Sequence, residues 1–273
     1  MKKNILITGS TDGIGKMAAM KLAKAGHHLF LHGRNPEKLE ATIADIRKEA
    51  NTREVYGAVA DFSDLDVVAR LAKKTDFELD RLDVLINNAG VFHSHERTNM
   101  EGLDLRFTVN YLAPYLLTRS LLPLLRKTAL ARVVNLSSAA QAPVDMHALE
   151  GKNTLSTNEA YAQSKLALTM WSMDLAQKEH SIRVTAVNPG SLLNTKMVQE
   201  AYGQHWSPAS KGADLLYDLA VSSEFTNETG GYFDNDSGDP RGQFGKAHTD
   251  AYDPTKIDRL LQTTERILGP RIQ

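Results

Sequence analysis

The chain has 273 residues, of which 42% are hydrophobic, and its 32 Lys and Arg residues nearly balance 33 Asp and Glu residues. A chain of this length can bury a full core, and we expect one domain over residues 1–273. The formal charge of −1 gives no field that would recruit nucleic acid or an anionic membrane, so small molecules and copies of the chain are the expected partners. The chain has no cysteine, which excludes disulfides, thiolate nucleophiles and Cys-ligated zinc.

No segment of the sequence has the character of an export signal or a membrane span. The start MKKNILIT has only Ile5 to Ile7 as an apolar run before polar residues and glycine follow. The most apolar later segment, Tyr111 to Leu125, is broken by Pro114, Arg119 and Pro123 and indicates a buried helix. We therefore expect a cytoplasmic protein without a membrane segment.

Short apolar runs alternate with helical patterns through most of the chain. The runs are Ile5 to Thr8, His28 to His32, Val55 to Ala60, Val84 to Asn87, Arg132 to Ser137 and Ile182 to Val187. Such alternation predicts βαβ units, and continuously apolar strands are typical of a parallel sheet covered on both faces. The expected fold class is α/β, a doubly wound parallel sheet of about seven strands with helices on both faces.

Local signals predict two helix starts and one loop. Asn35 before Pro36 is a capping residue followed by proline at the first helical position. Ser63 followed by Asp66 has the pattern of a capping box. The polar, glycine-rich stretch 234–249 predicts a long surface loop.

The segment TGSTDGIG directly after the first run places Gly9, Gly13 and Gly15 ahead of the helical pattern Lys16 to Ala25. Glycines between a strand and a helix let backbone N–H groups approach a pyrophosphate at the positive end of the helix. The motif indicates a Rossmann-type dinucleotide site. Its spacing is G-x-x-x-G-x-G instead of G-x-G-x-x-G, so a tight turn without a ligand is the alternative for this motif alone.

The residues after the second run favour NADP(H) over NAD(H). An acid at this place selects a free ribose 2′-hydroxyl, whereas an arginine accommodates a 2′-phosphate. The sequence reads LHGRNPEKL, with Arg34 available and no acid in place. NAD(H) stays as the alternative, because Asp12 stands where a basic residue would have strengthened the case and Arg34 also fits a solvated loop charge.

Tyr161 and Lys165 lie four residues apart in a strongly helical stretch, which predicts that both emerge on one face. A free tyrosine has a pKa near 10, and a nearby ammonium lowers that pKa by stabilising the phenolate. At an effective dielectric of about 20 and a separation of about 6 Å, one charge contributes roughly 3 kcal/mol. The pair therefore predicts a proton donor or acceptor that works near neutral pH.

Ser138 and Asn110 are the further catalytic candidates. Ser138 ends the run RVVNLSS at the carboxyl edge of the predicted sheet, where a hydroxyl can polarise a reacting oxygen. Asn110 stands within a helical segment that it disfavours, which indicates a local distortion that holds a water. Taken singly, each of the four candidates also fits a structural role, and their joint order along the chain favours function.

In these blocks the chain resembles the short-chain dehydrogenase/reductase family. Asn110, Ser138, Tyr161 and Lys165 are similar to its catalytic tetrad, and Asp61, the NNAG block Asn87 to Gly90 and the segment NPGSLLNT are similar to its cofactor segments. The resemblance implies cofactor contacts from Gly9, Ser10, Thr11, Asp12, Gly13, Ile14, Gly15, Arg34, Asp61, Asn88, Ala89, Gly90, Tyr161, Lys165, Pro189, Gly190 and Thr195.

The resemblance also implies a mechanism. Hydride passes from the nicotinamide to a carbonyl carbon while Tyr161 gives its proton to the oxygen, which Ser138 polarises. Lys165 holds the nicotinamide ribose and lowers the tyrosine pKa, and Asn110 positions a relay water. Ser138 and Tyr161 lie 23 positions apart, which is farther than in most members. This separation resembles that of the retinol-dehydrogenase-like and protochlorophyllide-reductase-like branch, whose substrate is not implied by the fold.

The expected substrate loops are residues 91–97, 141–158 and 191–206. Their apolar residues predict a hydrophobic ketone, aldehyde or secondary alcohol; they are Val91, Phe92, Val144, Met146, Leu192, Leu193, Met197 and Trp206. His93, His95 and His147 lie near these loops without a carboxylate cluster, so we expect no metal site. A homodimer or higher homo-oligomer is expected through the helices at 111–127 and 161–180.

Two other functions remain as alternatives. A nucleotide-sugar epimerase or dehydratase shares the glycine turn and the Tyr/Lys pair, but such chains usually carry a larger C-terminal substrate domain. A non-catalytic NADP(H)-binding regulator would keep the fold, although a pure binder has no chemical need for Tyr161 beside Lys165.

Overall fold

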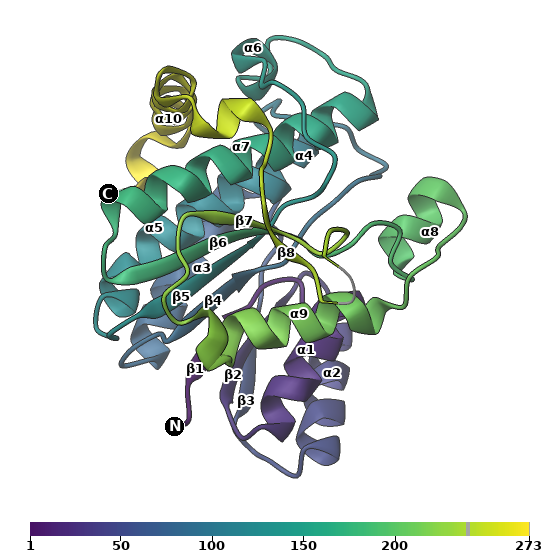
Figure 1. Cartoon of the computed structure of the whole chain (residues 1–273), viewed down its shortest axis with the longest axis vertical. Helices are drawn as coiled ribbons and strands as arrows, with labels where there is room; N and C mark the ends of the chain where they lie inside the picture. The colour runs from purple at the N-terminus through teal and green to yellow at the C-terminus, as the bar shows by residue number, and fades with distance from the viewer. Residues whose placement is uncertain (239–240, 273) are drawn as a thin grey trace.

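Eight strands form one sheet in the computed structural model, which describes residues 1–238 and 241–272 (Figure 1). The strands are β1 Asn4–Ile7, β2 His28–Gly33, β3 Val55–Val59, β4 Val84–Asn87, β5 Ala131–Leu136, β6 Ile182–Asn188, β7 Gly231–Asp234 and β8 Gln243–Gly245. Their order is β3-β2-β1-β4-β5-β6-β7-β8. β1 to β7 are parallel, which confirms the doubly wound parallel sheet of about seven strands, and β8 pairs antiparallel with β7.

The strand β8 lies inside stretch 234–249, so the prediction of a loop throughout that stretch was wrong. Phe244 of β8 packs against Phe233 of β7 with ring centroids 5.1 Å apart, and both rings also contact Phe225. The strand therefore depends on aromatic partners outside its own polar, glycine-rich surroundings.

The helices divide between the two faces of the sheet (Figure 1). The helices are α1 Gly13–Lys24, α2 Pro36–Glu49, α3 Leu65–Glu78, α4 Leu105–Phe107, α5 Ala113–Leu125, α6 Met146–Leu149, α7 Thr157–Lys178, α8 Lys196–Tyr202, α9 Ala209–Val221 and α10 Pro254–Leu268. Buried side chains of α1, α2 and α9 form one core layer, and those of α3, α5, α7 and α10 form the other. A π-helical turn, Thr108–Leu112, joins α4 to α5.

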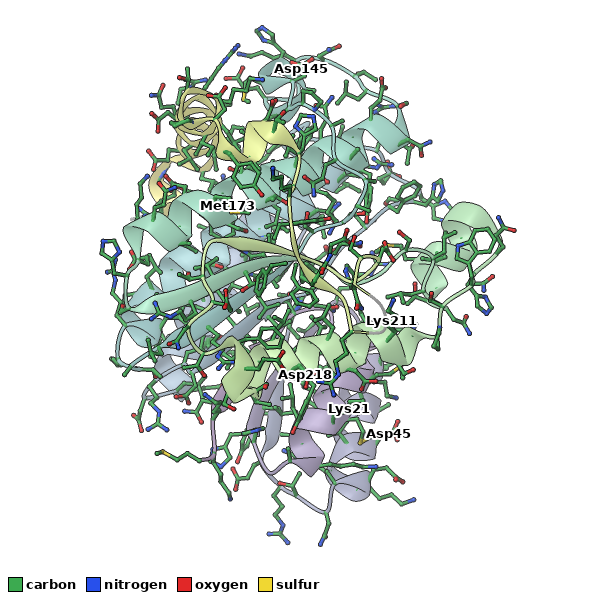
Figure 2. The ribbon with its side chains drawn as sticks, in the orientation of Figure 1. Lys21, Asp45, Asp145, Met173, Lys211 and Asp218 are labelled. Atoms are coloured by element: carbon green, nitrogen blue, oxygen red, sulfur yellow. The ribbon has the colours of Figure 1, made fainter. Side chains whose placement is uncertain are left out.

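Charged side chains lie at the surface of the layer formed by α1, α2 and α9. Figure 2 shows Lys21 of α1 and Asp218 of α9 near the contact between these two helices, and the Lys21 ammonium lies 2.6 Å from a carboxylate oxygen of Asp214 on α9. This exposed pair adds little stability by itself, because water screens it. The apolar residues beneath it hold α1 and α9 on the sheet.

Of the two predicted helix caps, one is confirmed and one is wrong. The Asn35 side chain accepts a hydrogen bond from Lys38 N and caps α2, with Pro36 at the first helical position. At α3, the cap is Asp64, whose carboxylate accepts from the amides of Asp66 and Val67. Ser63 instead belongs to the preceding turn, in which its amide donates to Asp61.

The C-terminal helix α10 packs against α7 (Figure 1) and contributes to the same core layer as α5, and α5 and α7 are the two helices through which we expect pairing of subunits. The Thr264 hydroxyl of α10 donates to Leu260 O, so the buried Tyr111 phenol is the donor in its 2.7 Å bond to Thr264. Pairing of subunits through α5 and α7 remains a prediction from the sequence. Throughout the residues described, no helix combines the length and apolar character that crossing a membrane requires.

We expect Tyr111→Phe to lower the free energy of unfolding by about 1 kcal/mol, because the substitution removes one buried hydrogen bond between the body and α10. Urea unfolding of both proteins measures the difference. Tyr115→Phe is the control, since the Tyr115 phenol donates to Glu265 over a longer distance of 3.4 Å and its loss should lower the free energy of unfolding less. Equal losses in the two variants would contradict the prediction.

Candidate active site

A cleft of about 1060 Å³ opens at the carboxyl edge of the sheet. Strand order reverses between β1 and β4, because the chain moves outward from β1 in both directions. Open α/β sheets bind ligands at such a switch point. The cleft runs from Arg34 and Lys38, beyond the end of β2, to Met197 and Val198 of α8.

The structure brings nearly all the predicted site residues to this one cleft. Those that line it are Gly9, Thr11, Asp12, Gly13, Ile14, Gly15, Arg34, Asp61, Asn88, Ala89, Gly90, Ser138, Tyr161, Lys165, Pro189, Gly190 and Thr195. Ser10 and Asn110 do not line it, because both are buried behind its wall.

The glycine turn is shaped by its close approach to the segment after β4. Gly9 has φ +63°, and a Cβ atom there would lie 2.7 Å from Ala89 Cα. A Cβ atom at Gly15 would lie 2.4 Å from Asn88 Nδ2. Only glycine fits at these two places without moving the neighbouring chain.

The NNAG block buttresses the turn through hydrogen bonds. Asn88 Nδ2 donates to the carbonyls of Thr8 (2.9 Å) and Gly9 (2.8 Å), while the amides of Asn88 and Ala89 donate to the Thr8 hydroxyl at 3.0 Å each. Asn87 lies deeper and donates to Thr118 of α5 and to Asn135 of the neighbouring strand β5. The block thus ties β1, β4 and β5 together beneath the cleft.

Asp12 caps the helix that begins at the turn. Its carboxylate accepts from Gly13 N at 2.8 Å and occupies the N-terminal end of α1. An acid is a favourable cap in the field of a helix N-terminus. This explains why an acid stands where we looked for a basic residue.

Tyr161 and Lys165 both face the cleft from α7, as their spacing predicts. Lys165 Nζ lies 5.6 Å from the centroid of the Tyr161 ring and donates to Leu136 O at 2.6 Å. The ring of Phe92 packs against the ring of Tyr161, with the two centroids 4.8 Å apart. A phenol and an ammonium therefore share one wall of the cleft, at the end of β5.

Burial changes the acid–base behaviour of this lysine. The side chain is 4% exposed, and desolvation lowers the pKa of Lys165 from 10.5 to about 7. The ammonium is held in place despite this penalty, because its hydrogen bond to the β5 carbonyl and its position against the cleft are set by α7. A negatively charged or hydroxyl-rich ligand beside Lys165 in the cleft would raise the pKa of Lys165 again.

Ser138 follows β5 at the cleft. Its hydroxyl oxygen accepts from Ala140 N at 3.1 Å, and its carbonyl accepts from the Tyr232 phenol and from Gln141 Nε2. The preceding Ser137 is buried and bonds to Thr169 of α7. The strand end is thereby joined to α7 and β7.

Asn110 lies in the π-helical turn, so the predicted local distortion is present. Its side chain accepts from Val91 N (2.7 Å) and donates to Val91 O and Ser164 Oγ (3.0 Å each). These bonds clamp the chain after the NNAG block against α7. The side chain is directed at Val91 and not into the cleft.

Two of the three expected substrate loops reach the cleft. Residues 91–97 contribute Val91 and Phe92, and residues 191–206 contribute Leu192, Leu193 and Met197. From residues 141–158 none lines it, since Val144 and Met146 pack on the core beside α6. Trp206 is 67% exposed and lies outside the lining set.

Sequence reasoning missed His32, Lys38 and Phe62, which also line the cleft. The available signal for His32 was an imidazole that directly follows the apolar residues Leu29 to Leu31 of the run HLFLHG. Phe62 offered none, because aromatic residues next to a strand are ordinary core residues. Over residues 1–238 and 241–272, no three His, Asp or Glu side chains gather closely enough to hold a metal ion.

The fold and the cleft together define a nucleotide-binding α/β protein with a Tyr/Lys pair at the switch point. The family model of short chain dehydrogenases matches residues 3–206. Human retinol dehydrogenase 13 is 33% identical over 252 residues, which cover 85% of this chain and 76% of that protein. A short chain dehydrogenase of Escherichia coli, solved with NADPH, superposes with a TM-score of 0.70 at 29% identity, covering 85% of this chain and 95% of that one.

A protein of Mycobacterium paratuberculosis has a similar structure over more of the chain, with a TM-score of 0.79 at 25% identity and coverage of 97% and 92%. This chain belongs to the short chain dehydrogenase family, and it is an oxidoreductase. The similarity to retinol dehydrogenases confirms the branch that the long gap before Tyr161 indicated.

We expect Lys165→Met to raise the free energy of unfolding by about 1–3 kcal/mol at pH 6, because it removes a desolvated charge. The folded pKa of about 7 lies below the ordinary 10.5, so between these values the unfolded chain binds more protons than the folded one. The stability of the unsubstituted protein therefore rises with pH in this window, and the advantage of the variant shrinks toward pH 10.5.

Chemical denaturation at several pH values measures this difference. Lys178→Met is the matched control, since Lys178 lies on the same helix, has a side chain that is 61% exposed and pairs with Asp174 at 2.9 Å. Its effect on the unfolding free energy should stay within about 0.5 kcal/mol and should not vary with pH. A Lys165→Met variant that is less stable at pH 6 than at pH 9, relative to the unsubstituted protein, would contradict the prediction.

Proposed function

We propose that the protein transfers hydride between NADP(H) and a carbonyl or alcohol substrate, with Tyr161 as the proton donor or acceptor. The observation that carries the proposal is the meeting of Tyr161, Lys165 and Ser138 with the glycine turn in one cleft. We also propose that residues 1–273 work as one domain. A cytoplasmic location and a homodimer remain predictions from the sequence.

The residues of the cleft fit a dinucleotide. Helix α1 presents its N-terminus to the cleft behind Gly13 and Ile14, and such an end favours a pyrophosphate. Arg34 and Lys38 supply two cations beyond β2, which suit a 2′-phosphate, and the solved E. coli relative binds NADPH. Lys165 offers ammonium hydrogens, which suit ribose hydroxyls.

When bound, the nicotinamide cofactor supplies or accepts the hydride. The Tyr161 phenol gives its proton to the carbonyl oxygen during reduction and takes it back during oxidation. The Lys165 ammonium lowers the energy of the phenolate left behind, because the two groups lie on one wall of a partly desolvated cleft. The Ser138 hydroxyl, held by the junction of β5 with α7 and β7, donates to the same oxygen.

Asn110 takes a positioning role in this proposal. Its amide group is engaged with Val91 and Ser164, so it fixes the backbone beside Phe92, whose ring packs on Tyr161. The relay water that we predicted for Asn110 remains a prediction.

The substrate is proposed to be an apolar ketone, aldehyde or alcohol. Val91, Phe92, Leu192 and Met197 give the catalytic end of the cleft apolar walls. The human relative is named as a retinol dehydrogenase, which agrees with an apolar substrate.

We expect Tyr161→Phe to reduce kcat by at least 100-fold while the Kd for NADPH stays within about threefold, because the phenol moves a proton and contributes little binding. NADPH oxidation is followed with a panel of lipophilic aldehydes, ketones and quinones. Tyr56→Phe, on the exposed edge strand β3, is the control and should keep full activity.

Stoichiometry separates the alternatives in the same assay. A dehydrogenase consumes one NADPH per product, whereas an epimerase or dehydratase regenerates its cofactor. Binding of NADPH without turnover across the panel would favour the regulator. Unchanged turnover in Tyr161→Phe would remove the proposed proton donor.

We expect Arg34→Leu to raise the Kd for NADPH about tenfold or more and to leave the Kd for NADH nearly unchanged, because only NADPH carries the 2′-phosphate. Fluorescence titration with each cofactor measures the ratio. Arg53→Leu, an exposed arginine before β3, is the control and should change neither value. Equal losses for NADPH and NADH would argue against 2′-phosphate recognition by Arg34.

A further inference from the structure

The side chain of His32 is buried beneath the glycine turn. It lies near the end of β2, is 3% exposed and borders the cleft. Its ring stacks on Phe62, with centroids 4.1 Å apart and planes 16° apart. His32 therefore lies between the turn after β1 and the chain that leaves β3.

Both ring nitrogens of His32 bond to backbone groups. The Gly9 amide donates to Nδ1 at 3.1 Å, and Nε2 lies 2.9 Å from the carbonyl oxygen of Ala60. An amide can only donate and a carbonyl can only accept, so the ring must accept at Nδ1 and donate at Nε2. Only the neutral tautomer with its proton on Nε2 satisfies both partners.

The surroundings of the ring favour this neutral form. Burial lowers the pKa of His32 from 6.5 to about 4, although the bond to Ala60 and the charge of Asp61 act in the opposite direction. The imidazole keeps one hydrogen-bonding pattern near neutral pH, and its two bonds do not interchange.

The backbone of His32 holds the next residue of the turn as well. The Ser10 amide donates to His32 O at 2.9 Å, and the His32 amide donates to Ser10 Oγ at 3.1 Å. Ser10 is fully buried, which explains why it does not line the cleft although we predicted a cofactor contact there. One residue of β2 thus receives the amides of both Gly9 and Ser10.

We propose that His32 is a positioning residue that sets the affinity for the dinucleotide by holding the glycine turn in its binding geometry. The inference rests on the proposed function, since it takes the cleft to bind NADP(H). The Gly9 amide points to the imidazole and not to a ligand. His32 therefore acts on cofactor affinity through the shape of the turn. Gly9 holds φ +63°, and the imidazole bond restricts the turn to this conformation before any ligand arrives.

The chain supplies a matched control in His27. Its Nδ1 accepts from the Lys3 amide at 3.2 Å, and its ring is 8% exposed. It joins the same pair of neighbouring chain segments as His32, but before β1 and β2 begin instead of after β1 ends. His27→Leu therefore removes an equivalent imidazole acceptor of a backbone amide, at the opposite edge of the sheet.

The test compares NADPH binding in the full-length unsubstituted protein, His32→Leu and His27→Leu. We expect the Kd for NADPH to rise about tenfold in His32→Leu and to stay within about twofold in His27→Leu, while both variants lose similar thermal stability. In His32→Asn, whose amide oxygen can still accept from Gly9, about half of the loss in binding free energy should be recovered. At saturating NADPH, kcat should stay within about twofold in all of them, because Tyr161 and Lys165 are untouched.

A Kd in His32→Leu within twofold of the unsubstituted value, or equal rises in His32→Leu and His27→Leu, would overturn the inference and leave the proposed function standing. Failure of the unsubstituted protein to bind NADPH would overturn both. If His32→Leu does not fold, nitrogen NMR of the unsubstituted protein decides. A scalar coupling across the bond from the Gly9 nitrogen to His32 Nδ1 supports the inference, and a proton on Nδ1 contradicts it.

Discussion

The close approach of the glycine turn to the segment after β4 is the constraint on which the rest of the site depends. Gly9 and Gly15 leave no room for a side chain against Asn88 and Ala89. The Asn88 amide and the Thr8 hydroxyl then lock the two segments together across the switch point. The cleft opens at the carboxyl edge because β1 and β4 are neighbours there while their following helices pack on opposite faces of the sheet.

The end of the cleft that holds Tyr161 and Lys165 contains a buried charge that lowers the stability of the fold. Lys165 is buried with its pKa lowered to about 7, and its ammonium hydrogen-bonds to the end of β5. An apolar side chain at this place would suit the surrounding core of α7 better. In the proposed function, the same desolvation that disfavours the charge of Lys165 strengthens its effect on the Tyr161 phenol, 5.6 Å from the ring centroid.

The fold could be predicted where a pattern was local and repeated. Alternation of apolar runs with helical periods predicted the parallel strands, and Asn35 with Pro36 predicted the start of α2. The strand β8 was missed because Phe244 packs on Phe233 of β7, and no local sequence pattern predicts this aromatic contact. At α3, the adjacent polar residues Ser63 and Asp64 could each cap the helix. Asp64 is the cap, because Ser63 belongs to the preceding turn, in which its amide donates to Asp61.

The sequence by itself determined which chemical groups stand close together along the chain. They are the glycine turn after a strand, and a phenol and an ammonium one helical turn apart on α7. These depend on neighbours within about ten residues, so spacing along the chain is sufficient to predict them. Tertiary structure alone decided the partners of Asn110 and His32, and which substrate loops reach the cleft. Val91 is 19 residues from Asn110 and Gly9 is 23 residues from His32, and only the packed sheet brings such distant groups within hydrogen-bond distance.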